Sequence, residues 1–243
     1  MGILSLFVMS QLAITLVNWV TPFLVRPHSL PRMDFSTGIP STFETLVVVP
    51  TMLTNEAEAL NLIEALEVRF LANRDDNLDF GLLTDFRDAD QETLPEDEPL
   101  LKLAQAGIEE LNKKYAAAAR DDVVDGPDRA VIRKNGPFFL FHRPRRWNGQ
   151  ERLWMGHERK RGKLADLNSL LRGGGGDAFS LIAGNTALLS NVKYVITLDT
   201  DTRLPRDAAR QLIGIITHPL NRALFDPARG RVVEGYGILQ PRI

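Results

Sequence analysis

The sequence predicts an α/β fold built around a mostly parallel sheet. Two short apolar runs, at residues 46–49 and 78–84, are predicted to be buried strands, and the segment between them has the periodicity of an amphipathic helix. A strand, a helix and a strand in this order form a right-handed unit with parallel strands. Residues 194–198 are β-branched, aromatic and apolar, which predicts a further strand buried on both faces.

The other elements follow from local patterns. Thr54 or Asn55 can cap the helix after the first strand. The residues predicted to face inward on that helix are Leu60, Ile63, Leu66 and Phe70. The remaining predicted elements are a helix at 99–119, a polar loop at 120–134, a strand at 138–141, a helix opening at 204–207 and a strand or hairpin at 231–242.

Composition excludes several classes of protein. The net charge of -2 gives no global field that would attract nucleic acid or anionic lipid. The chain has no cysteine, so a disulfide framework, a thiolate zinc site and a cysteine nucleophile are all excluded. The four histidines are scattered and form no His-Glu-x-x-His pair. The composition is therefore that of a globular protein, large enough at 243 residues to bury one sizeable core.

Residues 1–25 carry no charged side chain and are apolar all round. They exceed the roughly 20 residues needed to cross a bilayer, so a transmembrane helix is predicted. A signal peptide fits less well, because no basic region precedes the apolar run, and a buried helix is the other alternative. Arg26 and Arg32 follow directly, which places the rest of the chain in the cytoplasm. Residues 26–44, rich in proline and glycine, are predicted to be a linker before the domain at 45–243.

Two carboxylates follow the predicted strand at 194–198. Asp199 and Asp201 stand one residue apart at the carboxyl edge of the sheet, where ligands of open α/β sheets bind. Hard oxygen ligands suit Mg²⁺ or Mn²⁺ held against a phosphate-bearing substrate. The hypothesis is that this pair holds a divalent ion on a nucleotide diphosphate. The alternative is a loop with two solvated acids, since Asp88 and Asp90 repeat the spacing in a polar stretch.

Further candidate binding residues follow the other strands. Asp85, at the end of the second strand, can accept hydrogen bonds from a base or a ribose, although a capped turn is equally compatible with the pattern. Residues 143–163 are rich in arginine and lysine with two tryptophans, which fits single-stranded nucleic acid, a pyrophosphate and sugar pocket, or a solvated surface. The net acidity argues against nucleic acid. Lys163 and the amides of a helix predicted to start at Arg161 are placed to meet phosphate.

Several segments resemble the glycosyltransferase region of cyclic β-1,2-glucan synthases, which are large bacterial inner-membrane enzymes of glycosyltransferase family 84. The matching segments are residues 46–53, 82–86, 157–164, 196–202 and 237–242. The resemblance runs over nearly all of the chain, and the longer segments taken together are specific. It implies a GT-A nucleotide-sugar fold, UDP-glucose as the donor, a divalent metal, and a catalytic domain on the cytoplasmic side of the bacterial inner membrane.

The resemblance also assigns residues. Asp199 and Asp201 would bind the metal and the diphosphate. The uridine pocket would be lined by residues that follow the first two strands, namely Thr51, Glu56 and Asp85. The cations that would neutralise the diphosphate are Lys163 and, beside it, Arg159 or Arg161.

In the reaction that the resemblance implies, the 2-hydroxyl of the growing glucan attacks the anomeric carbon of glucose, and the configuration at that carbon is inverted. The general base is expected beyond Ile243, so the chain is expected to be an incomplete domain, the donor-binding part of a larger synthase polypeptide anchored in the lipid bilayer. Three alternatives remain: a processive synthase of another β-glucan, a non-catalytic nucleotide-sugar binding module with a membrane anchor, and a soluble scaffold.

Overall fold

The computed structural model describes residues 2–24, 29–121 and 136–241, with side chains at 9–21, 29–116 and 136–241. The chain divides into two compact units, Met1–Pro31 and Arg32–Ile243, and each is described by itself. The first unit contains helix α1 (Gly2–Leu24). Among the described residues, no helix combines the length and the apolar character of a membrane span. The transmembrane helix predicted for residues 1–25 is therefore not supported, and the inner-membrane location stays a prediction.

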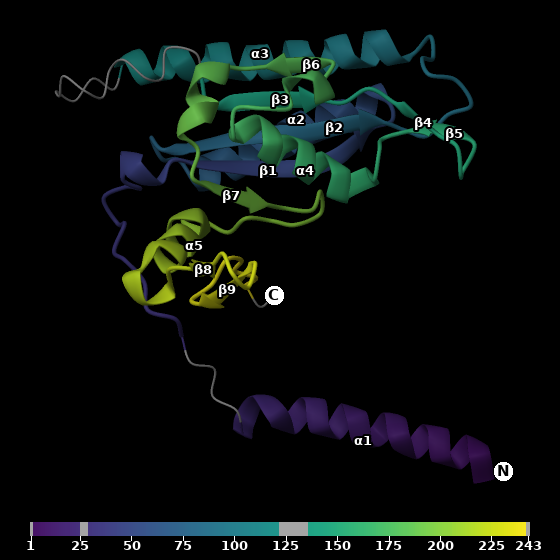
Figure 1. Ribbon diagram of the computed structural model, residues 1–243, viewed down its shortest axis with the longest axis vertical. Coiled ribbons are helices and arrows are strands. Elements are labelled where there is room, and N and C mark those ends of the chain that lie inside the picture. The colour runs from purple at the N-terminus through teal and green to yellow at the C-terminus, as the bar shows by residue number, and fades with distance from the viewer. Residues whose placement is uncertain (1, 25–28, 122–135, 242–243) are drawn as a thin grey trace. The chain divides into compact units, whose positions relative to one another are not determined.

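The second unit is organised around a mostly parallel sheet, as predicted (Figure 1). Within the described residues five strands follow the order β6-β3-β2-β1-β7, and only β6 is antiparallel to its neighbour. These strands are β1 (Thr45–Leu53), β2 (Leu78–Phe86), β3 (Phe138–His142), β6 (Leu181–Ala183) and β7 (Tyr194–Thr197). The chain steps outward from β1 to β3 and returns to the other side of β1 for β7. Such a reversal of strand order is where open α/β sheets bind ligands.

Helices cover both faces of the sheet. The helices are α2 (Glu56–Ala72), α3 (Asp97–Asp121), α4 (Arg159–Leu171) and α5 (Ala208–Thr217). Apolar residues of α2, α3 and α5 share one core cluster with Val47 and Val49 of β1. Leu46 and Val48 point to the opposite face and pack with Leu167 of α4 in a second cluster. In Figure 1, α4 lies in front of the sheet and α2 behind it.

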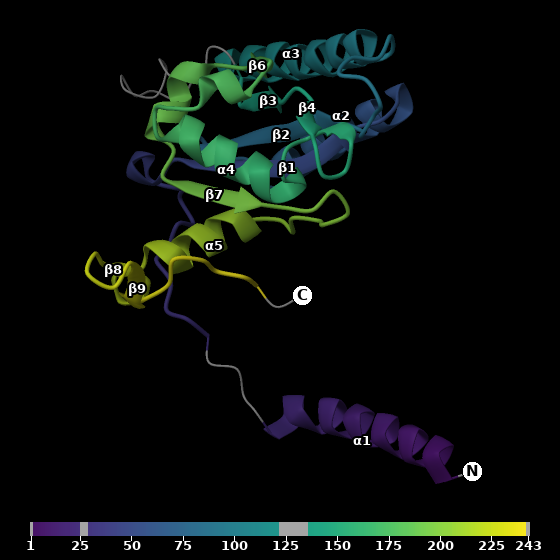
Figure 2. The same cartoon turned by 45° about the vertical axis from the view of Figure 1, so that its right-hand side comes forward.

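The shorter elements lie around this framework. Short 3-10 helices are η1 (Ser41–Phe43), η2 (Gly176–Ala178), η3 (Thr186–Asn191) and η4 (Pro219–Asn221). Two antiparallel hairpins pair β4 (Arg146–Asn148) with β5 (Leu153–Met155), and β8 (Leu224–Asp226) with β9 (Arg231–Glu234). The strand or hairpin predicted at 231–242 is thus β9 of a hairpin that lies beside α5, outside the central sheet (Figure 2).

Three local predictions differ from the structure. Residues 194–198 were predicted to be buried on both faces, but Val195 is 41% exposed, because β7 is an edge strand that pairs only with β1 among the described strands. Leu60 was predicted to face inward and is 54% exposed, since the buried stripe of α2 runs through Ala59, Leu62 and Leu66. The helix predicted to open at 204–207 begins at Ala208. Most of the loop predicted at 120–134 lies outside the described residues.

An aromatic cluster ties α2 and α3 to the sheet. The ring of Phe70 lies edge-on to Phe80 at 5.7 Å, to Tyr115 at 4.7 Å and to Phe138 at 5.0 Å between centroids. Phe70 is buried. A single side chain of α2 therefore contacts two strands and a second helix, in the edge-to-face geometry that aromatic pairs prefer.

We expect Phe70→Ala to lower the free energy of unfolding by about 3 to 5 kcal/mol, because it removes the centre of this cluster and leaves a cavity. Urea denaturation followed by circular dichroism measures the change. Leu71→Ala, on the exposed side of the same helix, is the matched control and is expected to stay within about 0.5 kcal/mol of wild type. Equal losses in both variants would contradict the assigned orientation of α2.

Candidate functional site

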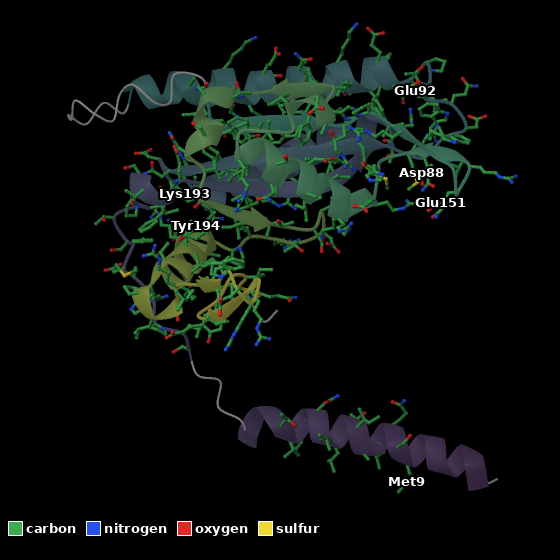
Figure 3. The ribbon with its side chains drawn as sticks, in the orientation of Figure 1. Met9, Asp88, Glu92, Glu151, Lys193 and Tyr194 are labelled. Carbon is green, nitrogen blue, oxygen red and sulfur yellow. The ribbon has the colours of Figure 1, made fainter. Side chains whose placement is uncertain are left out.

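The carboxyl ends of β1, β2, β3 and β7 meet at one edge of the sheet because these strands are parallel. Figure 3 marks both ends of the strands in the second unit: Lys193 and Tyr194 lie where β7 begins, and Asp88, Glu92 and Glu151 lie on the side where the parallel strands end. Most of the residues predicted to bind a ligand follow these strand ends, so the carboxyl edge is the candidate site.

Asp85, at the end of β2, lies between two buried cations. Its Oδ1 is 2.7 Å from Lys163 Nζ and its Oδ2 is 3.2 Å from Arg143 Nη2. Lys163 also donates to the carbonyl oxygen of Thr51 on β1. All three charged side chains are almost fully buried. The structure therefore joins three strands and α4 through one carboxylate.

Arg143 extends this network to the start of α4. Its Nη1 donates to Asp166 Oδ2 at 2.6 Å, and its Nη2 donates to the carbonyl oxygens of His157 and Arg159 at 3.1 and 3.3 Å. Gly156 lies against the same carboxylate, because a Cβ at this position would be 1.9 Å from Asp85 Oδ2. Only glycine lets the chain pass this close to Asp85.

The formal charges of the four side chains in this network balance. Two cations, Arg143 and Lys163, face two carboxylates, Asp85 and Asp166. Burial lowers the pKa of Lys163 from its ordinary value, while Asp85 acts in the opposite direction. The Asp85 carboxylate is thus what favours a charged donor at Lys163. The network therefore sets a carboxylate acceptor beside an ammonium donor.

His142 lies next to this network and is buried in its neutral form. Its Nδ1 is 2.8 Å from Thr84 Oγ1, and Thr84 itself donates to the carbonyl oxygen of Phe141. This arrangement makes Nδ1 the protonated nitrogen. Burial lowers the pKa of His142 to about 3, while the charge of Asp97 opposes the shift. The imidazole ring also packs edge-on against Phe86, with 4.3 Å between centroids.

Asp199 and Asp201 follow β7 in a turn that is closed by a hydrogen bond from Thr202 N to Asp199 O at 3.0 Å. Both acids are exposed, and Asp199 forms an ion pair with Lys160 of α4. No group of three or more histidine, aspartate or glutamate side chains able to hold a metal occurs in the described part of the chain. Two carboxylates still fit Mg²⁺ or Mn²⁺, because Mg²⁺ is commonly held by one or two carboxylates together with substrate phosphates.

The structure brings some predicted site residues together and separates others. Thr51, Asp85 and Lys163 are in contact, as described above. Glu56 is the exposed first residue of α2 and lies outside this network. Arg161 pairs with Glu158, the residue just before its own helix. Arg159 pairs with Asp88 at 2.8 Å and Glu151 at 3.5 Å, two acids that lie close together in Figure 3.

Sequence reasoning missed Arg143 and Lys160 as site residues. Arg143 directly follows β3, so the strand-end rule that selected Asp85 and Asp199 would also have selected it. Lys160 stands three residues before Lys163, and residues at this spacing are neighbours on a helix. Helical spacing from Lys163 would therefore have pointed to Lys160 as well as to Arg159, and away from Arg161.

We expect Asp85→Asn to lower the free energy of unfolding by about 3 to 5 kcal/mol, because it leaves two buried cations without their shared carboxylate. Chemical denaturation measures the loss. Asp88→Asn removes the same charge from an exposed pair and is expected to cost at most about 1 kcal/mol. The assigned role of Asp85 is wrong if the two variants prove equally stable.

The burial of His142 predicts a pH dependence of stability. The unfolded state takes up a proton below its ordinary pKa of 6.5, whereas the folded state does so only near 3. Stability should therefore fall as the pH drops, by about 2 kcal/mol between pH 6.5 and 5. Denaturation midpoints across this window measure the slope. His142→Asn is less stable at every pH because of the lost packing, but its slope should be shallower. An unchanged slope would show that other groups cause it.

The sequence was compared with protein-family models and with curated proteins. No protein-family model matches the sequence. The chain is 41% identical over 234 residues to cyclic β-(1,2)-glucan synthase NdvB of Rhizobium meliloti (strain 1021). The aligned region covers 96% of this chain and 8% of that protein, so the chain spans less than a tenth of the relative's length. This identity confirms the resemblance to cyclic β-1,2-glucan synthases that the sequence motifs indicate.

Proposed function

We propose that this chain forms the donor-binding part of a glucosyltransferase that builds β-1,2-glucan from UDP-glucose. One structural observation carries the proposal. Lys160 and Lys163 are neighbours on α4, and they pair with Asp199 and Asp85, respectively. A single helical turn thus links the acids at the end of β7 to the acid at the end of β2. The identity to a cyclic β-(1,2)-glucan synthase supports glucose transfer as the reaction.

The buried half of this site suits the base of the nucleotide. A uracil ring presents both donors and acceptors along its edge, and Asp85 and Lys163 offer a carboxylate acceptor beside an ammonium donor. The Thr51 carbonyl, which accepts from Lys163, completes the polar lining. A site built to form hydrogen bonds discriminates strongly against ligands that lack the matching groups. We therefore assign the uridine part of the donor to this half.

The exposed half suits the diphosphate. Asp199 and Asp201 would hold Mg²⁺ or Mn²⁺, and such an ion would neutralise the charge that develops on the departing diphosphate. Lys160 stands beside Asp199 and supplies a further cation. Arg159, which is exposed at the start of α4, lies one residue away along the chain. These side chains would orient the donor and screen its charge.

The transfer itself exchanges one bond for another. The 2-hydroxyl oxygen of the glucan acceptor would bond to the anomeric carbon as the bond from that carbon to the diphosphate oxygen breaks. The hydroxyl proton would pass to a carboxylate base, and UDP would leave. The residues of this chain would bind and orient the donor for that step. The base and the acceptor site are assigned to other parts of the synthase.

Titration calorimetry of UDP into the purified chain tests the proposal. We expect binding with Mn²⁺ present, and we expect EDTA or the double variant Asp199→Ala/Asp201→Ala to abolish it, because the two acids and the ion act together on the diphosphate. The matched control is Asp88→Ala/Asp90→Ala, which removes two acids at the same spacing in the chain. It also removes one of the two acids that pair with Arg159, which can only strengthen the attraction of this arginine to phosphate.

Metal-independent binding, or an equal loss in both double variants, would contradict the metal assignment. A folded wild-type chain that binds neither UDP nor uridine would overturn the proposed function. A complete synthase that binds UDP but transfers no glucose would instead favour a nucleotide-sugar binding module.

A further inference from the structure

Arg69 is a charged residue on the buried face of α2. It follows Leu62 and Leu66 on the helical stripe that packs against the sheet, and it is only 6% exposed. Burial lowers its pKa from the ordinary value. In the described part of the chain it forms no ion pair with a carboxylate. A buried guanidinium without an acid is costly unless its donors are satisfied, so its hydrogen-bond partners indicate what it does.

Among the described residues, the Arg69 guanidinium donates only to backbone carbonyls in the turn that follows β7. Its Nη2 donates to Thr200 O at 2.7 Å and to Thr202 O at 3.0 Å, and its Nε donates to Thr202 O at 3.3 Å. These two carbonyls flank Asp201, and Thr200 lies between the two acids. The planar guanidinium therefore holds the peptide chain on both sides of Asp201.

On the side that faces α2, the hydrogen bonds from Arg69 are the main support of the turn after β7. A groove with a volume of about 560 Å³ separates α2 from residues 200–205, and Arg69 lies at its wall. Apart from the bond from Thr202 N to Asp199 O within the turn, the neighbouring backbone and amide hydrogen bonds hold the ends of the segment. Leu198 N donates to Val48 O at 3.0 Å, and Asn73 Nδ2 donates to Leu204 O at 3.4 Å. Arg69 is the described side chain that bridges the middle.

We propose that Arg69 is a positioning residue that holds the Asp199–Asp201 turn in the geometry that binds a metal-bound diphosphate. It acts through the backbone of the turn and not through a contact with the ligand. Arginine suits this role better than lysine, because its fork places donors on two carbonyls at once. The inference rests on the proposed function, since it names what aligns the two acids for the ion and the diphosphate.

The test compares two ligands in variants of the full chain. We expect folded Arg69→Gln to bind UDP with Mn²⁺ at least about tenfold more weakly than wild type, as the loss of a group that orients metal ligands usually does. Its affinity for uridine, which we assign to Asp85 and Lys163, should be unchanged. Arg69→Lys should behave like Arg69→Gln despite keeping the charge. Arg74 is exposed and lies two residues after the end of α2. Arg74→Gln is therefore the control, and this variant should bind both ligands as tightly as wild type does.

Amide hydrogen exchange gives a readout that needs no ligand. Residues 199–204 should exchange faster in Arg69→Gln than in wild type, while β1 stays protected. If wild type binds neither UDP nor uridine, the proposed function fails. If wild type binds UDP without needing Mn²⁺, the metal assignment fails, and the role of Arg69 is rejected with it. If wild type binds and folded Arg69→Gln matches it, only the role of Arg69 is overturned. If neither Arg69 variant folds, Arg69 supports the whole domain, and the positioning role is likewise rejected.

Discussion

The buried carboxylate of Asp85 is the constraint on which the rest of the carboxyl edge depends. A carboxylate removed from water is tolerated only when cations and donors compensate it. Arg143 from the end of β3 and Lys163 from α4 provide that compensation, and Lys163 in turn reaches the backbone of β1. Because each partner comes from a different element, the position of α4 over the sheet is fixed by charge as well as by packing.

The two halves of the candidate site differ in how they are held. The half around Asp85 is buried and is linked by short contacts among side chains. The half around Asp199 is exposed, and its turn is held from behind through backbone carbonyls. This division suits a ligand with an uncharged ring at one end and a charged group at the other. An uncharged ring suits the buried half, whereas a charged group would stay partly hydrated beside an ion in the exposed half.

Much of the fold could be predicted from the sequence, because local patterns determine it. The strand–helix–strand order was predicted, and so was a cap for α2 at Thr54 or Asn55; the structure confirms the order and shows that Asn55 is the cap. The exposure of β7 could not be predicted in the same way, since it depends on which strands lie beside it in the sheet. The apolar run of an edge strand looks like that of a central one.

The candidate site was less predictable because its contacts join distant parts of the chain. Arg143 and Asp85 are 58 residues apart, and Lys163 and Thr51 are 112 apart. Charged side chains at the strand ends indicated at which edge of the sheet the candidate site lies. They did not indicate which of these side chains pair with one another. Arg69 left a different signal, a charge on the apolar stripe of a helix. That signal becomes interpretable only when the turn after β7 is seen against α2.

The ion pair between Lys160 and Asp199 has a thermodynamic consequence for the proposed function. Both side chains are more than half exposed, at 52% and 61%, so their mutual attraction is weak and exchange of partners costs little. A cation that took Asp199 would release Lys160 for phosphate, and a phosphate that took Lys160 would release Asp199 for the cation. Each ligand would then raise the affinity for the other by the same factor. Metal and diphosphate would bind as one cooperative unit.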